Sequence, residues 1–311
     1  MTQLTPKQVA RAIGVSDASL KRWCDKGIIA SVRTVGGHRR IPLPAVIRFL
    51  RDTGRELVRP EVLGLPPTTG QGKTVINRAF ALVAQALIDG DEQSVQRLVF
   101  DLLLAGHSIR DICDKVITPA FREIGSRWQH GDVEVYQERR GVEICLRTLS
   151  RVRDTFPEPP ADAPLAIGAT PETDPYTLAT LMISLALQER GWRAENLGNN
   201  VPIASLMKAV QDLKPRMLWL SISWLKDAAT FAVQCNQLFE CCQKAGVAMA
   251  VGGHGLTADL RAQIRYSSFC DTLGHLADFA DTVVMPRPVA KGDAAAATEE
   301  ESSEPRRDEQ A

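Results

Sequence analysis

The sequence predicts a multidomain α and α/β protein, in which a winged helix-turn-helix unit precedes a four-helix bundle and a doubly wound parallel sheet. Three observations lead to this prediction. The first 60 residues carry twelve basic and four acidic side chains, although the whole chain of 311 residues is neutral. Proline-rich segments at residues 57–71 and 156–164 divide the chain. Between them apolar residues recur at helical spacing only, whereas beyond them short apolar runs alternate with helical stretches.

The composition is that of a globular protein with more than one domain. With 44% hydrophobic and 24% charged residues, the chain is neither disordered nor collagen-like. No apolar run approaches the roughly 18 residues of a membrane helix, and the N-terminus lacks the apolar core of a signal peptide. We therefore expect a cytoplasmic protein without a membrane partner. The seven scattered cysteines contain no C-x-x-C pair, so we expect free thiols and no metal site.

Residues 1–56 carry the signals of a DNA-binding domain in the order that a helix-turn-helix requires. Thr5 and Pro6 predict the start of a first helix, Gly14 predicts its end, and Ser16 caps a second helix. The second helix of such a unit enters the major groove of DNA. A cationic hairpin follows it, with a glycine pair at the tip. The residues expected to contact DNA are Ser16, Ser19, Lys21, Arg22, Arg33, Gly36, Gly37, His38, Arg39 and Arg40.

The segments TPKQVARAIGVSDASLKRWCDKGII and TVGGHRRIP resemble the winged-helix DNA-binding domain of MerR-type regulators. The resemblance covers most of residues 3–52 and implies that the partner is double-stranded promoter or operator DNA. It also implies a homo-oligomer, a dimer or a tetramer, because palindromic half-sites mirror the symmetry of the protein. The alternative is a basic surface without a nucleic-acid partner.

Residues 57–72 are predicted to be a linker, and residues 73–156 a bundle of four helices with short connections. The stretch IGSRWQHGDVEVYQERRGVEICLRTL resembles the helical cap of cobalamin-binding proteins, which carries a tryptophan, nine residues and then Glu-His. Trp128 and Glu138 keep this spacing, but Arg139 replaces the histidine. Gln129 stands where light-sensing cobalamin regulators have a further histidine. The resemblance implies that Trp128, Gln129 and Glu138 contact a cofactor; the alternative is a core tryptophan and an ion-paired glutamate.

Residues 164–285 are predicted to form five βα units of a parallel sheet that is covered on both faces. Ligands of such sheets bind beyond the carboxyl ends of the strands. The expected strands are residues 165–169, 193–197, 217–222, 247–251 and 269–273, and the expected helices are residues 175–190, 203–213, 226–245, 258–266 and 276–284.

This unit resembles the cobalamin-binding Rossmann-like domain over nearly its whole length. That family carries an acid-x-His-x-x-Gly loop after the first strand, a serine after the third and Gly-Gly after the fourth. Here the corresponding residues are Glu172, Asp174, Ser221, Gly252 and Gly253, so an aspartate replaces the histidine that would bind cobalt. A carboxylate suits cobalt poorly. The resemblance implies that the serine and the glycines line the slot for the nucleotide tail of cobalamin.

Together these patterns predict a transcriptional regulator, not an enzyme, that is similar to the light-sensing adenosylcobalamin regulators. Its C-terminal module is expected to control oligomerisation and operator binding, with cobalamin as the candidate cofactor or, because the histidine is replaced, with none. The alternatives are a corrinoid-binding methyltransferase-like subunit and a degenerate scaffold that binds a partner protein. Residues 286–311 are rich in Ala, Glu and Ser and are predicted to be a disordered acidic tail.

Overall fold

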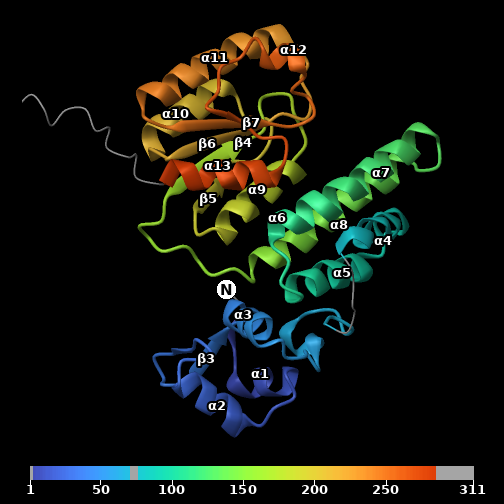
Figure 1. Cartoon of the computed structure of the whole chain (residues 1–311), viewed down its shortest axis with the longest axis vertical. Helices are drawn as coiled ribbons and strands as arrows, with labels where there is room; N and C mark the ends of the chain where they lie inside the picture. The colour runs from blue at the N-terminus through green and yellow to red at the C-terminus, as the bar shows by residue number, and fades with distance from the viewer. Residues whose placement is uncertain (1–2, 71–75, 285–311) are drawn as a thin grey trace, which may run out of the picture.

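The computed structural model describes residues 3–70 and 76–284, which fold into a winged helix-turn-helix unit, a helical bundle and a parallel sheet with flanking helices (Figure 1). The mixed α and α/β fold that the sequence predicts is confirmed. The predicted acidic tail lies outside the described residues, as does the end of the predicted linker. No helix within the described part is long and apolar enough to cross a membrane.

The N-terminal unit is built by the local signals that the sequence contains. The Thr5 hydroxyl accepts a hydrogen bond from Gln8 N at the start of the first helix, and the Ser16 hydroxyl accepts one from Ser19 N at the start of the second. Gly14 has a φ of 67° between them. The elements are β1 (Gln3–Leu4), α1 (Pro6–Ala12), α2 (Asp17–Asp25), β2 (Val32–Arg33), β3 (Arg39–Pro42) and α3 (Leu43–Thr53). The antiparallel strand order β1-β3-β2 adds one strand to the predicted hairpin.

The proline-rich segment after this unit is packed against it, which differs from the predicted linker without helical structure. Residues Pro60–Leu63 form a 3₁₀ helix, η1, and Leu57, Leu63 and Leu65 are buried. Backbone groups of residues 58 and 59 donate to the carbonyl of Ala12 at the end of α1. A short 3₁₀ turn tolerates proline at its first position, where no hydrogen-bond donor is needed.

The middle unit contains the four predicted helical segments, the third of which is interrupted by a π-helical turn. Its elements are α4 (Ile76–Asp89), α5 (Glu92–Leu104), α6 (Ile109–Ile112), the π turn η2 (Cys113–Ile117), α7 (Thr118–Gln129) and α8 (Val135–Arg153). The π turn ends two residues before Pro119, which supplies no backbone donor to the helix.

The C-terminal unit is a five-stranded parallel sheet with the order β5-β4-β6-β7-β8. Its elements are β4 (Leu165–Ala169), α9 (Leu178–Glu189), β5 (Arg193–Asn196), α10 (Ile203–Leu213), β6 (Met217–Ser221), α11 (Ala228–Lys244), β7 (Ala248–Gly252), α12 (Ala258–Arg261), β8 (Ser268–Phe269) and α13 (Leu273–Val284). Helices α9 and α13 cover one face and α10 and α11 the other (Figure 1). The chain order reverses at β4, so the carboxyl ends of β4 and β6 meet at a topological switch point.

Several predicted elements of this unit differ from the structure at their ends, and two of these differences have the same kind of cause. The expected strand 269–273 stops at Phe269. The reason is that the Asp114 carboxylate accepts hydrogen bonds from Leu273 N and Gly274 N, so that α13 starts at Leu273. The expected helix 258–266 ends at Arg261, because the Asn236 side chain binds backbone groups of residues 263 and 265. In both places a side chain distant in sequence decides the boundary.

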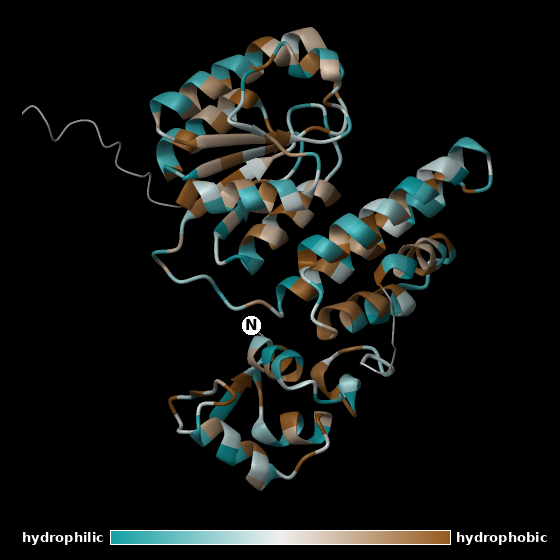
Figure 2. Cartoon of the chain, viewed as in Figure 1, coloured by the Kyte–Doolittle hydropathy of each residue, from teal (hydrophilic) through white to brown (hydrophobic). Residues whose placement is uncertain are grey.

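The three units share one continuous core. A single cluster of buried apolar residues runs from α1–α3 through the bundle to the sheet face that α9 and α13 cover. A second cluster fills the opposite face. Figure 2 shows that the central strands are mostly hydrophobic. Both Glu189 carboxylate oxygens accept from Ile109 N, at 2.9 and 3.1 Å, and tie α9 to the start of α6. The bundle and the sheet are therefore held together by buried packing as well as by helix caps.

Candidate functional site

The α2 helix presents the predicted base-contacting residues on an exposed surface. Lys21 and Arg22 are exposed, and at the N-terminus of the helix the hydroxyls of Ser16 and Ser19 are 3.0 Å apart. Ser16 is occupied as a helix cap, so its first role is to fix where α2 begins. The two cations remain as the groups of this helix that can reach base edges or phosphates.

The hairpin of β2 and β3 forms the predicted wing. Arg33, Gly36, Gly37 and His38 are exposed, and Gly37 has a φ of 76°, which a residue with a side chain rarely adopts. The Arg33 guanidinium donates to the Gly37 carbonyl at 3.4 Å and lies along the turn. Val35 at the tip is also exposed. No sequence signal marks Val35 as a functional residue, because isolated surface valines are common.

Arg39 braces the wing against α2 and does not extend freely into solvent, as a phosphate-binding residue would. Its guanidinium forms an ion pair with Asp25 and donates to the Lys21 carbonyl at 3.2 Å, and the side chain is only 15% exposed. The hydrogen bond from Arg39 to the Asp25 carboxylate lowers the pKa of Asp25 below its ordinary value. Arg40 is half-buried and donates to the Arg39 carbonyl at 3.1 Å. The wing and α2 therefore form one preorganised surface.

Replacing Arg39 by alanine is expected to weaken DNA binding about tenfold without changing its salt dependence. The change removes the brace between wing and helix but no phosphate contact, and each lost phosphate contact would lower the salt slope by about one. Fluorescence anisotropy at several salt concentrations measures both quantities. Asp25→Asn is the matched variant and should reproduce the loss. Tighter binding by Asp25→Asn would instead identify Arg39 as a phosphate contact.

The predicted cap residues lie where α7 ends and α8 begins. Trp128 is 52% exposed and Gln129 is exposed, whereas Glu138 is half-buried and lies 3.7 Å from Arg139. The Arg139 guanidinium is 5.5 Å from the centre of the Tyr176 ring, in the loop after β4. The helical unit and the sheet edge therefore touch directly at the position where the resemblance expects a histidine of the cap.

Asp174 is completely buried and its carboxylate is fully used by the backbone. One oxygen accepts from Tyr176 N at 3.0 Å, and the other accepts from Ser223 N at 2.6 Å and Trp224 N at 3.1 Å. These bonds join the loop after β4 to the loop after β6. They also explain why α9 begins at Leu178 instead of the predicted residue 175, since residues 174–177 are held in a loop. Glu172, two residues earlier, is exposed.

Ser221 and the glycine pair come together at the carboxyl ends of β6 and β7. Ser221 is buried and pairs in register with Gly252. A side chain on Gly252 would overlap the Cys270 carbonyl, and one on Gly253, whose φ is 111°, would overlap the backbone of Ile222. The close approach of neighbouring backbone segments therefore requires both glycines in this chain.

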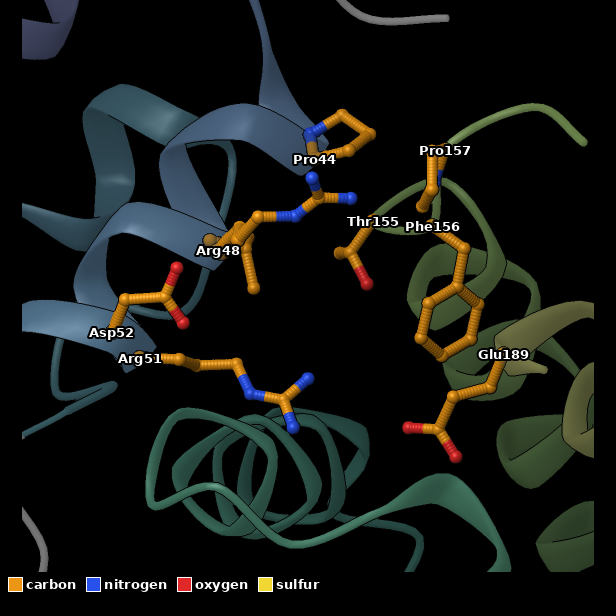
Figure 3. A pocket seen from close by; sticks show the side chains of 9 residues that line it. Pro44, Arg48, Arg51, Asp52, Thr155, Phe156, Pro157 and Glu189 are labelled. Carbon is orange, nitrogen blue, oxygen red and sulfur yellow. The ribbon is translucent and has the colours of Figure 1, made fainter. Parts of the chain in front are cut away.

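A cavity of 310 Å³ lies elsewhere, where the winged unit, the bundle and the sheet unit meet (Figure 3). Arg51 of α3 and Glu189 of α9 reach toward it from opposite sides, and the Phe156 ring lies on the same side as Glu189. Burial raises the pKa of Glu189 above its ordinary value. Arg51 also donates to the Gly106 carbonyl at 3.4 Å. The cavity is thus lined by α3, by the segment after α8 and by α9 of the sheet unit.

All seven cysteines are free, as the sequence predicts, and six of them are buried. Burial raises the pKa of Cys145, Cys235 and Cys242 to about 12, so these thiols stay protonated at neutral pH.

We expect a thiol reagent such as DTNB to modify only the half-buried Cys241 rapidly in the native protein, and all seven thiols after unfolding. Rapid native modification of more than one thiol would contradict the buried positions.

Within residues 3–70 and 76–284 no group of three His, Cys, Asp or Glu residues could hold a metal ion. His130 and His254, which directly follow Gln129 and Gly253 in the sequence, are both exposed. The His130 ring contacts the Ser126 carbonyl at 2.7 Å.

Comparison with known families defines the class. Residues 4–54 match a helix-turn-helix domain, residues 80–152 match a B12 binding domain, and residues 164–274 match a second family that is also described as a B12 binding domain. The chain is therefore a helix-turn-helix transcriptional regulator that carries B12 binding domains, as the sequence predicts.

Among its relatives is the HTH-type transcriptional repressor CarA of Myxococcus xanthus, which is 26% identical over 82% of this chain and 88% of the relative. CarH of the same organism is 27% identical over 50% of this chain and 51% of the relative. The trimethylamine corrinoid protein of Methanosarcina barkeri is 23% identical over 58% of this chain and 84% of the relative. The structure of the monomethylamine corrinoid protein of Methanosarcina barkeri superimposes with a TM-score of 0.56 at 16% identity, covering 67% of this chain and 100% of that one.

Proposed function

We propose that this chain binds operator DNA through α2 and the wing, and that its bundle and sheet set the oligomeric state that allows two copies to bind together. The observation that carries the proposal is the preorganised cationic surface in which Arg39 fixes the wing to α2 beside Lys21 and Arg22. Such a surface combines base-reading and phosphate-binding groups. The net charge of +8 over the first 60 residues favours polyanionic DNA as the partner.

The arrangement of α3 supports control of DNA binding by the C-terminal module. This helix follows the wing directly, and its apolar residues belong to the same core as the bundle. Arg51 binds the carbonyl at the end of α5, and the cavity at the junction brings Arg51 close to Glu189 of the sheet unit. Association of two modules would thereby fix the spacing of two α2 helices. We infer a dimer as the smallest active assembly, since operator half-sites mirror protein symmetry.

Cobalamin bound through residue 174 does not fit this structure, so we propose that assembly does not depend on a histidine-ligated cofactor. The Asp174 carboxylate has three backbone donors and no exposed atom, and a carboxylate is in addition a poor ligand for cobalt. In addition, the Arg139 guanidinium lies 5.5 Å from the centre of the Tyr176 ring, where the cap meets the loop after β4. The same argument counts against a methyltransferase-like subunit, which would need an accessible corrinoid.

A random pool of duplexes tests this function without presupposing an operator sequence. The full chain is used to select duplexes from a random pool, and the affinity for the selected duplex is compared with that for a scrambled one by anisotropy. We expect at least a thousandfold preference, a steep salt dependence and a symmetric selected site. Light scattering after gel filtration gives the stoichiometry and should find an even number of chains on one duplex. Equal binding to both duplexes would overturn the operator-binding function.

A further inference from the structure

The sheet face that α9 and α13 cover holds a large aromatic side chain between small neighbours. Trp219 of β6 pairs in register with Gly168 of β4 on one side and with Ala250 of β7 on the other. Its indole lies directly over Gly168, since a side chain built on that glycine would overlap the ring. Trp219 is 1% exposed. The neighbouring strands thus leave a groove along this face, and the indole fills it.

A chain of hydrogen bonds fixes the orientation of this indole. Its Nε1 donates to the hydroxyl of Thr180 on α9 at 2.8 Å, and Thr180 is itself completely buried. The Thr180 hydroxyl donates to the Asn196 side chain at 3.2 Å, which also accepts from Gly198 N at 3.0 Å in the loop after β5. A buried indole N–H needs a partner, and this one has it. The side chain is therefore held in one position across β6, α9 and β5.

We propose that Trp219 occupies the slot that would otherwise take the nucleotide tail of cobalamin. The tail ends in a dimethylbenzimidazole, whose fused six- and five-membered aromatic rings match those of an indole. Side chains alternate along a strand, so Ser221 lies two residues further on the same face and pairs with Gly252. These are the residues that the resemblance assigns to the slot. The chain thus supplies its own aromatic filling for the space between the sheet and α9.

If Trp219 fills the slot, the nucleotide tail of cobalamin is excluded from it. This inference rests on the proposed function, in which the bundle and the sheet form the regulatory module. Protein interiors are close-packed, so the indole and a second bicyclic ring cannot share the space over Gly168. Admitting the tail would require Trp219 to break its bond to Thr180 and to leave the core. The Trp219 indole therefore completes the packing of α9 against the sheet, and no ligand is needed for it.

The wild-type protein is tested with a pair of corrinoids that differ in the tail. Equilibrium dialysis in the dark compares adenosylcobalamin with adenosylcobinamide, which has the same corrin ring and upper ligand but no nucleotide tail. We expect no preference for cobalamin, whether both corrinoids are retained equally or neither is retained. Retention of cobalamin at least ten times tighter than cobinamide would overturn the proposal, because it would mean that the tail has a slot. No DNA enters this assay, so its failure is separate from failure of operator binding.

A variant tests the identity of the slot. Trp219→Ala removes the filling and is expected to give a cobalamin preference of at least tenfold over cobinamide. Trp192→Ala is the matched control, because Trp192 is a buried tryptophan of the same core cluster but does not cover Gly168. Both variants should melt roughly 10 °C below wild type. Equal corrinoid retention by the two variants would overturn the assignment of the slot.

A smaller change is available where alanine prevents folding. Trp219→Leu keeps an apolar side chain of intermediate volume, and it opens the half of the space that the six-membered ring fills. It should show the same preference for cobalamin in weaker form. A folded Trp219→Leu protein that behaves as wild type does with both corrinoids would contradict the proposal.

Discussion

Replacing Asp174 by histidine is expected to destabilise the protein by about 4 kcal/mol and not to create a cobalt-binding residue. The carboxylate accepts three backbone hydrogen bonds inside the protein, and hydrogen bonds to a charged group contribute about 1.5–3 kcal/mol each. An imidazole can accept only one of them through a single ring nitrogen. The free energy of unfolding, measured in urea, should fall accordingly, and corrinoid retention should not rise above that of wild type.

The control for this prediction is Asp174→Asn, which has nearly the same shape. Its one carbonyl oxygen can still accept from Ser223 N and Trp224 N, while the amide nitrogen cannot accept from Tyr176 N. We therefore expect a loss of about 2 kcal/mol, intermediate between wild type and the histidine variant. A histidine variant as stable as wild type would show that the loop can open at Asp174, and the structural role assigned to this carboxylate would be wrong.

The sequence predicts best where a local rule determines the structure. Thr5 and Ser16 cap the helices that they are predicted to cap, because a helix start needs a nearby side-chain acceptor. The strands β4, β6 and β7 follow the apolar runs closely, because parallel strands inside a sheet are buried on both faces. Element ends such as that of β8 are less predictable, since Asp114 lies 159 residues before the backbone group that it binds.

The candidate sites show the same division between local and distant contacts. The exposed positions of Lys21 and Arg22 follow from the helical period and the caps. The ion pair of Arg39 with Asp25 does not, because it depends on how the wing folds back on α2. The role of Trp219 is likewise invisible in sequence, where it is one apolar residue of a buried strand. The Trp219 ring can lie where it does only because Gly168, its partner on the neighbouring strand, has no side chain.

Replacing both Lys21 and Arg22 by alanine is expected to lower the affinity for the selected operator at least a hundredfold. These are the exposed cations of α2, and a side chain that binds a base edge contributes about 1–3 kcal/mol, while each phosphate contact adds about one to the salt slope. Anisotropy titrations from low to moderate salt separate the two contributions. Arg22→Ala alone should also change which duplexes are selected, whereas Lys21→Ala alone should weaken all duplexes to a similar extent.

The charge-matched control is the double variant Arg193→Ala and Lys208→Ala, which removes two exposed cations from the sheet unit. It lowers the net charge by the same amount but leaves α2 and the wing unchanged, so its affinity should stay within about twofold of wild type. If both double variants lost affinity equally, binding would follow the overall charge of the chain. A loss confined to the α2 variant requires contact at that helix, because long-range attraction between exposed charges is screened beyond about 10 Å at 0.1 M salt.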